Sequence, residues 1–403
     1  MSKQLGSLRG RRRSLSRRPE ATARRLLIVC SYFPPHVGGA EQYAHHLATA
    51  LVATGRWDVT VVTTKGKGLR THCSDEGGLR VLRLGWWMCY SYTPISPMWP
   101  WQLRRIIRSL DPDVINAHTP VPLLSDVATW VAGRRLFLLT YHAVGLEKDS
   151  GPLFDFVRST YELLERFTLK RADAVLAVSA AVQQALQGRV AGRLVTFSNA
   201  VPRDELSDEA AEPCAGQFVF LARLDKEHSW KGLDLVLQAV SLCPQARLKV
   251  AGDGNLRSFY EKTSFELGVF DRIQFLGTVT GEAKDRLIRT STALIAYPTT
   301  SNDGFPTVLL EAWANRVPVL AADIGALRTL VREGIDGLLV PPSQPVALAK
   351  AMRRLMDDPA LVSRLGMQGR ARVDDMTWER LAQRFEQLVE SLLEERMAIG
   401  KRQ

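Results

Sequence analysis

Short, uninterrupted apolar runs recur along this chain, and segments with helical periodicity separate most of them. Examples are RLLIVC from Arg25, DVINAH from Asp113 and RLFLLTYH from Arg135. Continuous runs of this kind, unlike alternating apolar and polar residues, are typical of strands covered on both faces, as in parallel sheets. The sequence therefore predicts doubly wound α/β architecture, whose ligands bind beyond the carboxyl ends of the strands.

The pattern stops once and then restarts, which predicts two domains with a cleft between them. The interruption, PRDELSDEAAEPCAG, is polar, acidic and proline-containing, as linkers are. A length of 403 residues also suits two domains. The predicted parts are a disordered basic tail (1–24), an N-terminal Rossmann-like domain (25–201), a linker (202–216), a C-terminal Rossmann-like domain (217–375) and a C-terminal amphipathic helix (376–403).

The net charge of +11 lies mostly in the tail, because residues 1–25 hold nine Lys or Arg and one acid, Glu20. Anionic lipid or nucleic acid are the partners that such a tail fits. The apolar run after it is too short for a signal peptide, and no apolar run reaches the length of about 18 residues that a spanning helix needs. We therefore expect a cytoplasmic protein, soluble or peripheral on the inner face of the membrane.

Cysteines and acids give no convincing metal site. Five cysteines are scattered without a C-x-x-C pair, which fits a reducing compartment. A D-x-D sequence at Asp111 and Asp113 has Pro112 between the acids, and the end of a helix before a strand explains it. We expect no metal and no cofactor.

In the first half, unusual groups follow strand ends. Gly38 and Gly39 come before a helix and could present bare backbone N–H groups to an anion, although a tight strand-to-helix turn would explain them too. His118 and His142 end neighbouring strands and face the predicted cleft, although a lone histidine is usually a satisfied side chain.

The second half repeats this arrangement. Arg223 ends a strand and Lys231 precedes a helix, so that together they could hold a diphosphate, although both could be solvated charges. Gly252 and Gly254 form a second glycine-rich strand exit.

Two acids, Asp303 and Glu311, flank a helix start, where acids are also ordinary dipole partners. Pro306 suits the first helical turn, and the free N–H groups after it can face phosphate while Glu311 accepts the ribose hydroxyls. The predicted nucleotide contacts here are Phe305, Pro306, Thr307, Val308 and Glu311.

Together these segments resemble the retaining glycosyltransferases of family 4, which have the GT-B fold of two facing Rossmann-like domains. The resemblance rests on PPHVGGAEQ, DPDVINAH, ARLDKEHSWKG, VAGDG and DGFPTVLLEAWANRVPVLAAD, in this order, and covers nearly everything from Arg25 onwards. It implies transfer of a sugar, usually without metal, from a nucleotide diphosphate sugar to an acceptor hydroxyl. A lipid-linked or polysaccharide acceptor, as in cell-envelope polysaccharide biosynthesis, is the expected one.

The resemblance implies that residues 25–201 form the acceptor-side domain, that residues 217–375 bind the nucleotide sugar, and that the helix of residues 376–403 packs back on the N-terminal domain. It also implies roles for single residues. It places the ribose on Glu311, the diphosphate on Arg223 and Lys231, the donor sugar near His118, and the acceptor and phosphate near Gly38 and Gly39. His142 is then on the acceptor side, and the catalytic set is His118, Arg223, Lys231, Asp303 and Glu311. The family usually has Glu where this chain has Asp303, so the contact with the donor sugar is the one that departs from the pattern.

Two other functions fit parts of the sequence. One is a non-catalytic, nucleic-acid-associated protein on a transferase scaffold that uses the basic tail, and the other is a GT-B sugar-nucleotide epimerase. The near-neutral body and the intact site favour the transferase. One aromatic segment, WWMCYSYTPISPMWPW, suits a membrane interface or packing beneath a loop, and holds Trp86, Trp87, Tyr90, Tyr92, Trp99 and Trp101.

Overall fold

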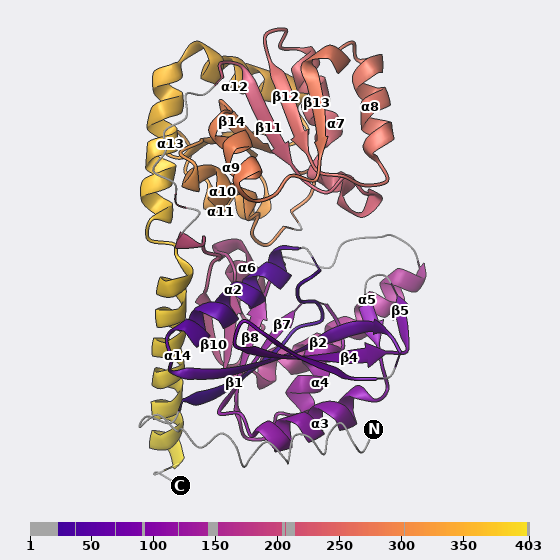
Figure 1. The fold of residues 1–403 in the computed structure, drawn as a ribbon, viewed down its shortest axis with the longest axis vertical. Coiled ribbons are helices and arrows are strands. Elements are labelled where there is room, and N and C mark those ends of the chain that lie inside the picture. Colours follow the sequence, from indigo (N-terminus) through magenta and orange to yellow (C-terminus); the bar gives the residue numbers. More distant parts are fainter. Residues whose placement is uncertain are drawn as a thin grey trace.

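The computed structural model has two α/β domains stacked end to end, with two successive C-terminal helices along one side, one beside each domain (Figure 1). It describes residues 23–36, 38–68, 70–90, 93–119, 121–143, 152–203, 206, 214–301 and 303–400. Nearly all of the basic tail, much of the predicted linker, and Tyr92 lie outside this description.

The first domain is built on an eight-stranded sheet in the order β10-β9-β8-β7-β1-β2-β4-β3, in which only the edge strand β3 is antiparallel to its neighbour. Its strands are β1 (Arg24–Val29), β2 (Trp57–Lys67), β3 (His72–Glu76), β4 (Leu79–Trp86), β7 (Val114–Thr119), β8 (Leu136–Tyr141), β9 (Ala174–Ala177) and β10 (Arg193–Thr196). Its helices are α2 (Gly39–Ala53), α3 (Trp99–Leu110), α4 (Leu124–Val131), α5 (Pro152–Arg171) and α6 (Ala180–Leu186). A small separate hairpin pairs β5 (Met88–Tyr90) with β6 (Thr93–Ile95).

The second domain has a fully parallel six-stranded sheet in the order β13-β12-β11-β14-β15-β16. Its strands are β11 (Gln217–Leu221), β12 (Arg247–Ala251), β13 (Ile273–Gly277), β14 (Ala293–Ala296), β15 (Val319–Ala322) and β16 (Gly337–Val340). Its helices are η3 (Lys226–Lys231), α7 (Leu233–Ser241), α8 (Arg257–Glu266), η4 (Phe270–Arg272), α9 (Gly281–Arg289), α10 (Val308–Ala314), α11 (Gly325–Leu330), α12 (Pro345–Asp357) and α13 (Pro359–Val373).

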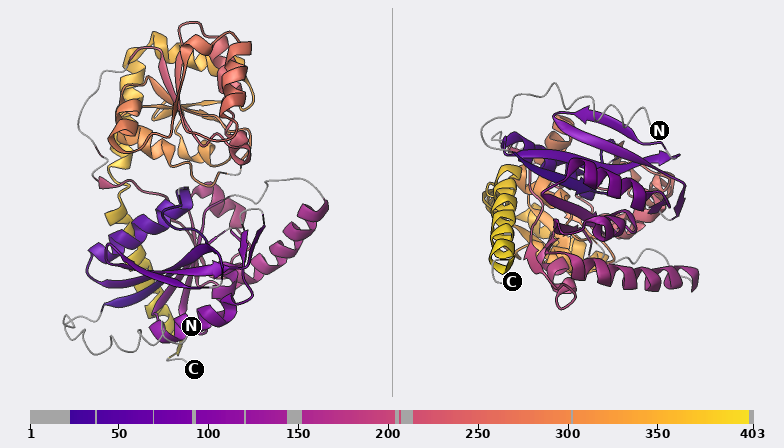
Figure 2. Two further views of the ribbon diagram at one scale, coloured as in Figure 1. Left: turned by 45° about the vertical axis from the view of Figure 1, so that its right-hand side comes forward. Right: turned by 90° about the horizontal axis from the view of Figure 1, so that it is seen from below.

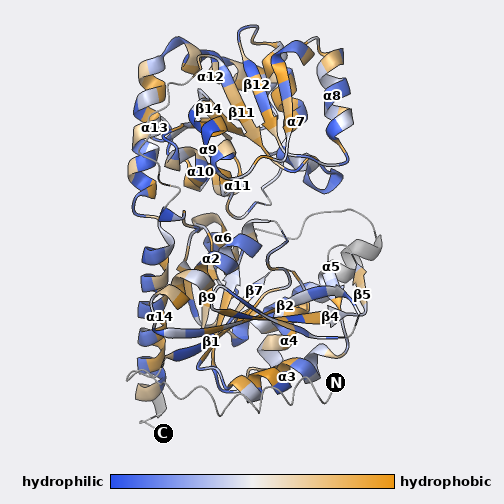
Figure 3. Ribbon diagram, in the orientation of Figure 1, coloured by the Kyte–Doolittle hydropathy of each residue, from blue (hydrophilic) through white to orange (hydrophobic). Residues whose placement is uncertain are grey.

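The continuous apolar runs of the sequence are the central strands of these sheets. Strands β7, β8, β9, β14 and β15 are buried along their whole length, because helices cover both faces (Figure 2). Hydrophobic colour accordingly gathers on the strands of the second-domain sheet, whereas the long last helix alternates between hydrophilic and hydrophobic along its length (Figure 3).

The last helix, α14 (Trp378–Gly400), lies along the first domain although it follows the second in sequence (Figure 1). Trp57 donates from Nε1 to Glu386 at 2.9 Å, and Arg193 donates to Ser391 at 3.0 Å. Phe385 is fully buried and its ring lies edge-on to that of Trp57. The helix therefore contributes to the core of the first domain and ties the two domains together.

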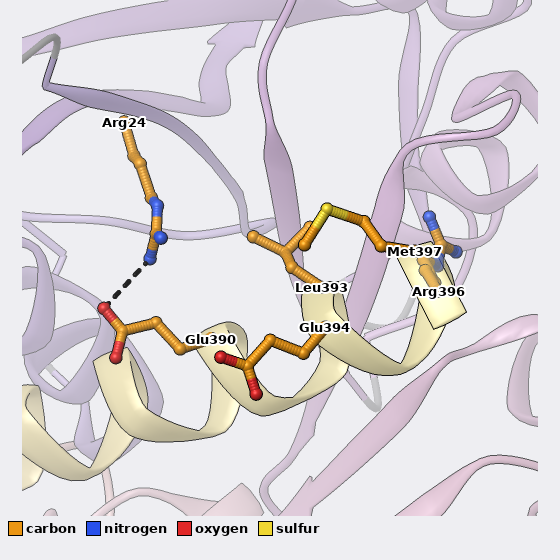
Figure 4. Close-up of a pocket in the computed structure, with 6 residues that line it drawn as sticks. All are labelled: Arg24, Glu390, Leu393, Glu394, Arg396 and Met397. Carbon is orange, nitrogen blue, oxygen red and sulfur yellow. Dashed lines mark hydrogen bonds and ion pairs between the residues drawn. The ribbon is translucent and has the colours of Figure 1, made fainter. Parts of the chain in front are cut away.

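A pocket near the end of α14 lies beside the first residues of β1 (Figure 4). Arg24 crosses it to Glu390, with 3.4 Å between Nη1 and Oε1. None of the candidate site residues lines this pocket, which is formed by Arg24, Glu390, Leu393, Glu394, Arg396 and Met397.

The two acids of the D-x-D sequence have structural partners. Asp111 ends α3 and contacts Arg135 at 3.0 Å and Arg25 at 3.2 Å. Asp113 accepts a hydrogen bond from the backbone N–H of Arg25 at 2.8 Å. These contacts join the end of α3 to the start of β1. The two acids therefore have the structural role that the end of a helix before a strand predicts.

Candidate active site

Both predicted cations lie at the carboxyl end of β11. Arg223 is half-exposed and contacts Asp225, with 2.7 Å between Nη2 and Oδ2. Lys231 ends η3, lies over the Trp230 ring at 4.4 Å and forms an ion pair with Asp303. Although burial acts to raise it, the pKa of Asp225 lies below its ordinary value, because His228 and Arg223 contact the carboxylate. The two cations are thus held on one rim by acids of the same domain.

Two glycines allow the exits of β11 and β12 to touch. A Cβ on Gly252 would lie 1.7 Å from the carbonyl oxygen of Ala222, and one on Gly254 would lie 2.4 Å from that of Leu224. Both glycines have a positive φ as well. Their close packing positions the loop that carries Arg223, while the donor contact that we expect from them stays a prediction.

The second acid, Glu311, lies within α10 and faces a cation that the sequence analysis did not single out. Its carboxylate is 3.2 Å from Nζ of Lys284 on α9. The first hydrogen bond of this turn runs from Leu309 N to Pro306 O at 3.2 Å. The N–H groups of Thr307 and Val308 therefore precede the helical ladder, at the end where the helix dipole is positive.

The N-terminus of α2 lies opposite this helix start. Gly38 is the N-cap of α2, and a Cβ on Gly39 would be 3.8 Å from the Thr307 side chain of the second domain. Phe305, on the way to Thr307, is buried. The structure thus brings the glycine turn of the first domain and the start of α10 together across the domain boundary.

The two histidines form one hydrogen-bonded pair at the ends of β7 and β8. His118 Nδ1 is 3.0 Å from His142 Nε2, and His118 Nε2 is 3.1 Å from Oδ1 of Asn116. Because that oxygen only accepts, His118 donates from Nε2 and accepts at Nδ1, so His142 donates from its Nε2. Burial, and then the neighbouring His142, keeps the pKa of His118 well below its ordinary value, and burial lowers the pKa of His142 to about 3. Both rings are neutral at neutral pH.

The loop that carries Asp303 contacts the first domain directly. Asp303 forms an isolated β-bridge with Ala143, the residue after His142. A Cβ on the next residue, Gly304, would lie 2.0 Å from the carbonyl oxygen of His142. Asp303 therefore links Lys231 of its own domain to the histidine pair of the other domain.

Three of these partners were missed from the sequence. Asn116 shares a strand face with His118 at a spacing of two, so strand periodicity contained a signal for it. Asp225 and Lys284 had no such signal, because an acid after a strand and a lysine in a surface helix are ordinary residues. Only their distances to Arg223 and Glu311 mark them.

Comparisons with known proteins agree with this arrangement. The model of "Glycosyltransferase Family 4" matches residues 37–205, and that of "Glycosyl transferases group 1" matches residues 205–372. A glycogen synthase of Mycobacterium tuberculosis is 25% identical over 89% of this chain and 92% of its own. A phosphatidyl-myo-inositol mannosyltransferase of Mycobacterium leprae is 26% identical over 91% of this chain and 97% of its own.

Solved structures show the same fold. A sucrose-phosphate synthase from Thermosynechococcus elongatus superimposes with a TM-score of 0.74 and 23% identity, over 92% of this chain and 100% of that chain. The Anabaena protein HepE, solved in complex with UDP, gives a TM-score of 0.71 with 19% identity, over 91% of this chain and 100% of that chain. Two facing parallel-sheet domains with strand-end groups across their boundary define the GT-B class of glycosyltransferases, as the sequence predicted.

Within that class, this chain belongs to the family-4 glycosyltransferases, with a second domain of the group 1 type. The resemblance seen in the sequence is thereby confirmed, and the protein is a glycosyltransferase. This family membership favours transfer over the nucleic-acid-associated protein and the epimerase.

Proposed function

We propose that this protein transfers a sugar from a nucleotide diphosphate sugar to a hydroxyl of a lipid-linked or polysaccharide acceptor. The transfer retains the anomeric configuration of the donor and needs no metal. The observation that carries this proposal is a pair of contacts across the domain boundary. The Asp303 loop, which holds Lys231, touches the end of β8 beside the neutral histidine pair, and the start of α10 faces Gly39. A UDP complex of HepE, which has the same fold, supports a nucleotide-linked donor.

The second domain supplies positive charge where the leaving group becomes negative. Departure of a nucleoside diphosphate leaves charge on the phosphate oxygens, and Arg223, Lys231 and the N–H groups before α10 are preorganised partners for that charge. Lys231 is held by Asp303, so the incoming diphosphate competes with that carboxylate. Glu311, held by Lys284, accepts hydrogen bonds from the ribose hydroxyls.

The first domain contributes uncharged polar side chains to the site. Because its Nε2–H is used by His118, His142 has a free lone pair on Nδ1 toward which an acceptor hydroxyl can donate. A neutral ring also adds no positive charge beside the sugar. Asp303 is one methylene shorter than the family's usual Glu, and its ion pair and its bridge to Ala143 fix how far it reaches toward the donor sugar.

The donor is tested by thermal shift against a panel of nucleotide sugars and free nucleotides, because a ligand that binds only the folded state raises the melting temperature. The matching donor is then used for transfer assays in chelator, with NMR of the product's anomeric proton. We expect full activity in chelator and a retained configuration. An enzyme silenced by chelator and restored by manganese, or an inverted product, would contradict the mechanism.

A membrane-linked acceptor would bring the protein to a lipid surface. Among the described residues, no helix is long and apolar enough to cross a membrane. We propose a peripheral protein at the inner face of the membrane, whose basic tail, residues 1–25, contacts anionic lipid. The mannosyltransferase of Mycobacterium leprae, whose name includes a phosphatidyl-myo-inositol, supports an acceptor of this kind.

A further inference from the structure

The aromatic segment between β4 and α3 divides into a buried part and an exposed part. Trp99 is 1% exposed and donates from Nε1 to Gly85 O at 3.2 Å, so it belongs to the core. Trp87 is 64% exposed, Tyr90 43% and Trp101 48%. Packing beneath a loop therefore explains Trp99 and leaves three large rings facing solvent.

The outer face of α3 places cations beside one of these rings. Arg104, Arg105 and Arg108 are exposed and follow Trp101 at spacings of three, four and seven, which is one face of a helix. The guanidinium of Arg105 lies over the Trp101 ring at 5.5 Å. No acid occurs from Leu79 to Leu110, so nothing along this stretch neutralises the arginines.

The hairpin lies at the carboxyl end of the first-domain sheet. It follows β4, which is parallel to β2 and, through it, to β1, β7 and β8. The histidine pair lies at the carboxyl ends of β7 and β8 and therefore at the same end of the sheet. Trp87 is fixed to the hairpin by its N–H, which donates to Ile95 O at 2.9 Å. The base of the hairpin is thus hydrogen-bonded, with Trp87 exposed beside it.

We propose that the exposed rings of Trp87 and Tyr90, at strand β5, and the outer face of α3 form a docking surface for an anionic lipid bilayer. Exposed Trp and Tyr favour the headgroup layer, and arginines with no acid among them match its phosphates. This surface is separate from the basic tail. The proposal rests on the proposed function in one respect. A lipid-linked acceptor lies in the bilayer, and docking through this surface would turn the acceptor side of the protein toward it.

The test is sedimentation of the full-length protein with vesicles of phosphatidylcholine, alone or mixed with phosphatidylglycerol. Replacing Arg104, Arg105 and Arg108 by Gln should weaken binding to the mixed vesicles by roughly fivefold for each arginine lost. The control is the double change Lys350→Gln and Arg354→Gln, which removes two exposed cations from α12 in the second domain. The control should bind vesicles almost like the wild type.

The rings are tested in the same assay. Trp87→Ala and Trp101→Ala should each weaken binding by about tenfold, and this loss should persist at high salt because it is apolar. Phe265→Ala, which removes a ring that is 75% exposed on α8, is the matched control. Circular dichroism and the melting shift with nucleotide verify the fold and the donor site of every variant, so a failed docking surface and a failed donor site are distinguishable.

The proposal is overturned if the arginine and tryptophan variants bind mixed vesicles like the wild type. It is also overturned if the α12 control loses as much binding, or if pure phosphatidylcholine binds equally well. Loss of duplex DNA binding, without loss of vesicle binding, would assign the surface to nucleic acid instead. The proposal is supported if only the arginine and tryptophan variants lose binding, and if they lose it on anionic vesicles.

Discussion

Gly304→Ala tests whether contact between the two domains at the Asp303 loop is needed for transfer. The new Cβ would lie 2.0 Å from the carbonyl oxygen and 2.6 Å from the carbonyl carbon of His142. Both atoms belong to the backbone, so no side-chain rotation relieves the clash. Ordinary contact begins at 3.4 Å, so the loop and the end of β8 must separate by more than an ångström.

That separation breaks the bridge between Asp303 and Ala143 and moves the donor side away from the histidine pair. A misplacement of about 1 Å costs roughly a hundredfold in rate. We expect turnover to fall by that order, while free nucleotide, most of whose proposed contacts lie in the second domain, binds within about twofold of the wild type. Calorimetry with the nucleotide and initial rates with the donor measure the two quantities.

Gly334→Ala is the matched control. Gly334 also belongs to the second domain and has a φ of +70, and a Cβ there meets nothing within 4 Å. It should cost about 1 kcal/mol of stability and leave turnover unchanged. Wild-type turnover in Gly304→Ala would refute the argument. A loss of nucleotide affinity as large as the loss of rate would also refute it, because the change would then disturb the second domain itself.

Four further predictions concern charge. Glu311→Gln should weaken binding of the free nucleotide by about ten- to a hundredfold, since a charged hydrogen-bond acceptor contributes roughly 1.5–3 kcal/mol. Asp303→Asn should instead lower turnover without weakening nucleotide binding, and equal effects of the two changes in calorimetry would contradict this division. Because burial lowers the pKa of His142 to about 3 from an ordinary 6.5, the unfolded chain binds a proton that the folded chain does not. The contribution of His142 to stability is therefore fully present above the pKa of its side chain in the unfolded chain. That contribution is lost as the pH falls toward the pKa of His142 in the folded protein. Between about pH 7 and pH 5, urea unfolding should show the wild type losing about 1–2 kcal/mol more than His142→Gln, and parallel losses would contradict it. Deleting residues 2–22 should weaken binding to anionic vesicles at low salt, and unchanged binding would give the tail another role.

The fold class, and most of the charged and polar candidate residues at the strand ends, could be predicted from the sequence. Continuous apolar runs fixed which segments are central strands, because only strands covered on both faces can be apolar throughout. Parallel strands bring their carboxyl ends to one edge, so Arg223, Lys231, His118 and His142 were recognisable there from order alone. The hairpin of β5 and β6 and the edge strand β3 were not predicted, because both are short and largely exposed.

Tertiary structure alone decided the pairings. That Lys231 binds Asp303, that Lys284 binds Glu311, and that Asn116 orients His118 depend on distances between separate segments. The neutral state of the histidines comes likewise from burial, which a single sequence does not reveal. The chain's own pattern determined that two largely parallel sheets form and which strand ends hold the candidate site, because periodicity and order are local properties. Which charges meet across the boundary, and which tryptophans face solvent, was decided by packing, because one ring enters the core and its neighbour two positions on does not.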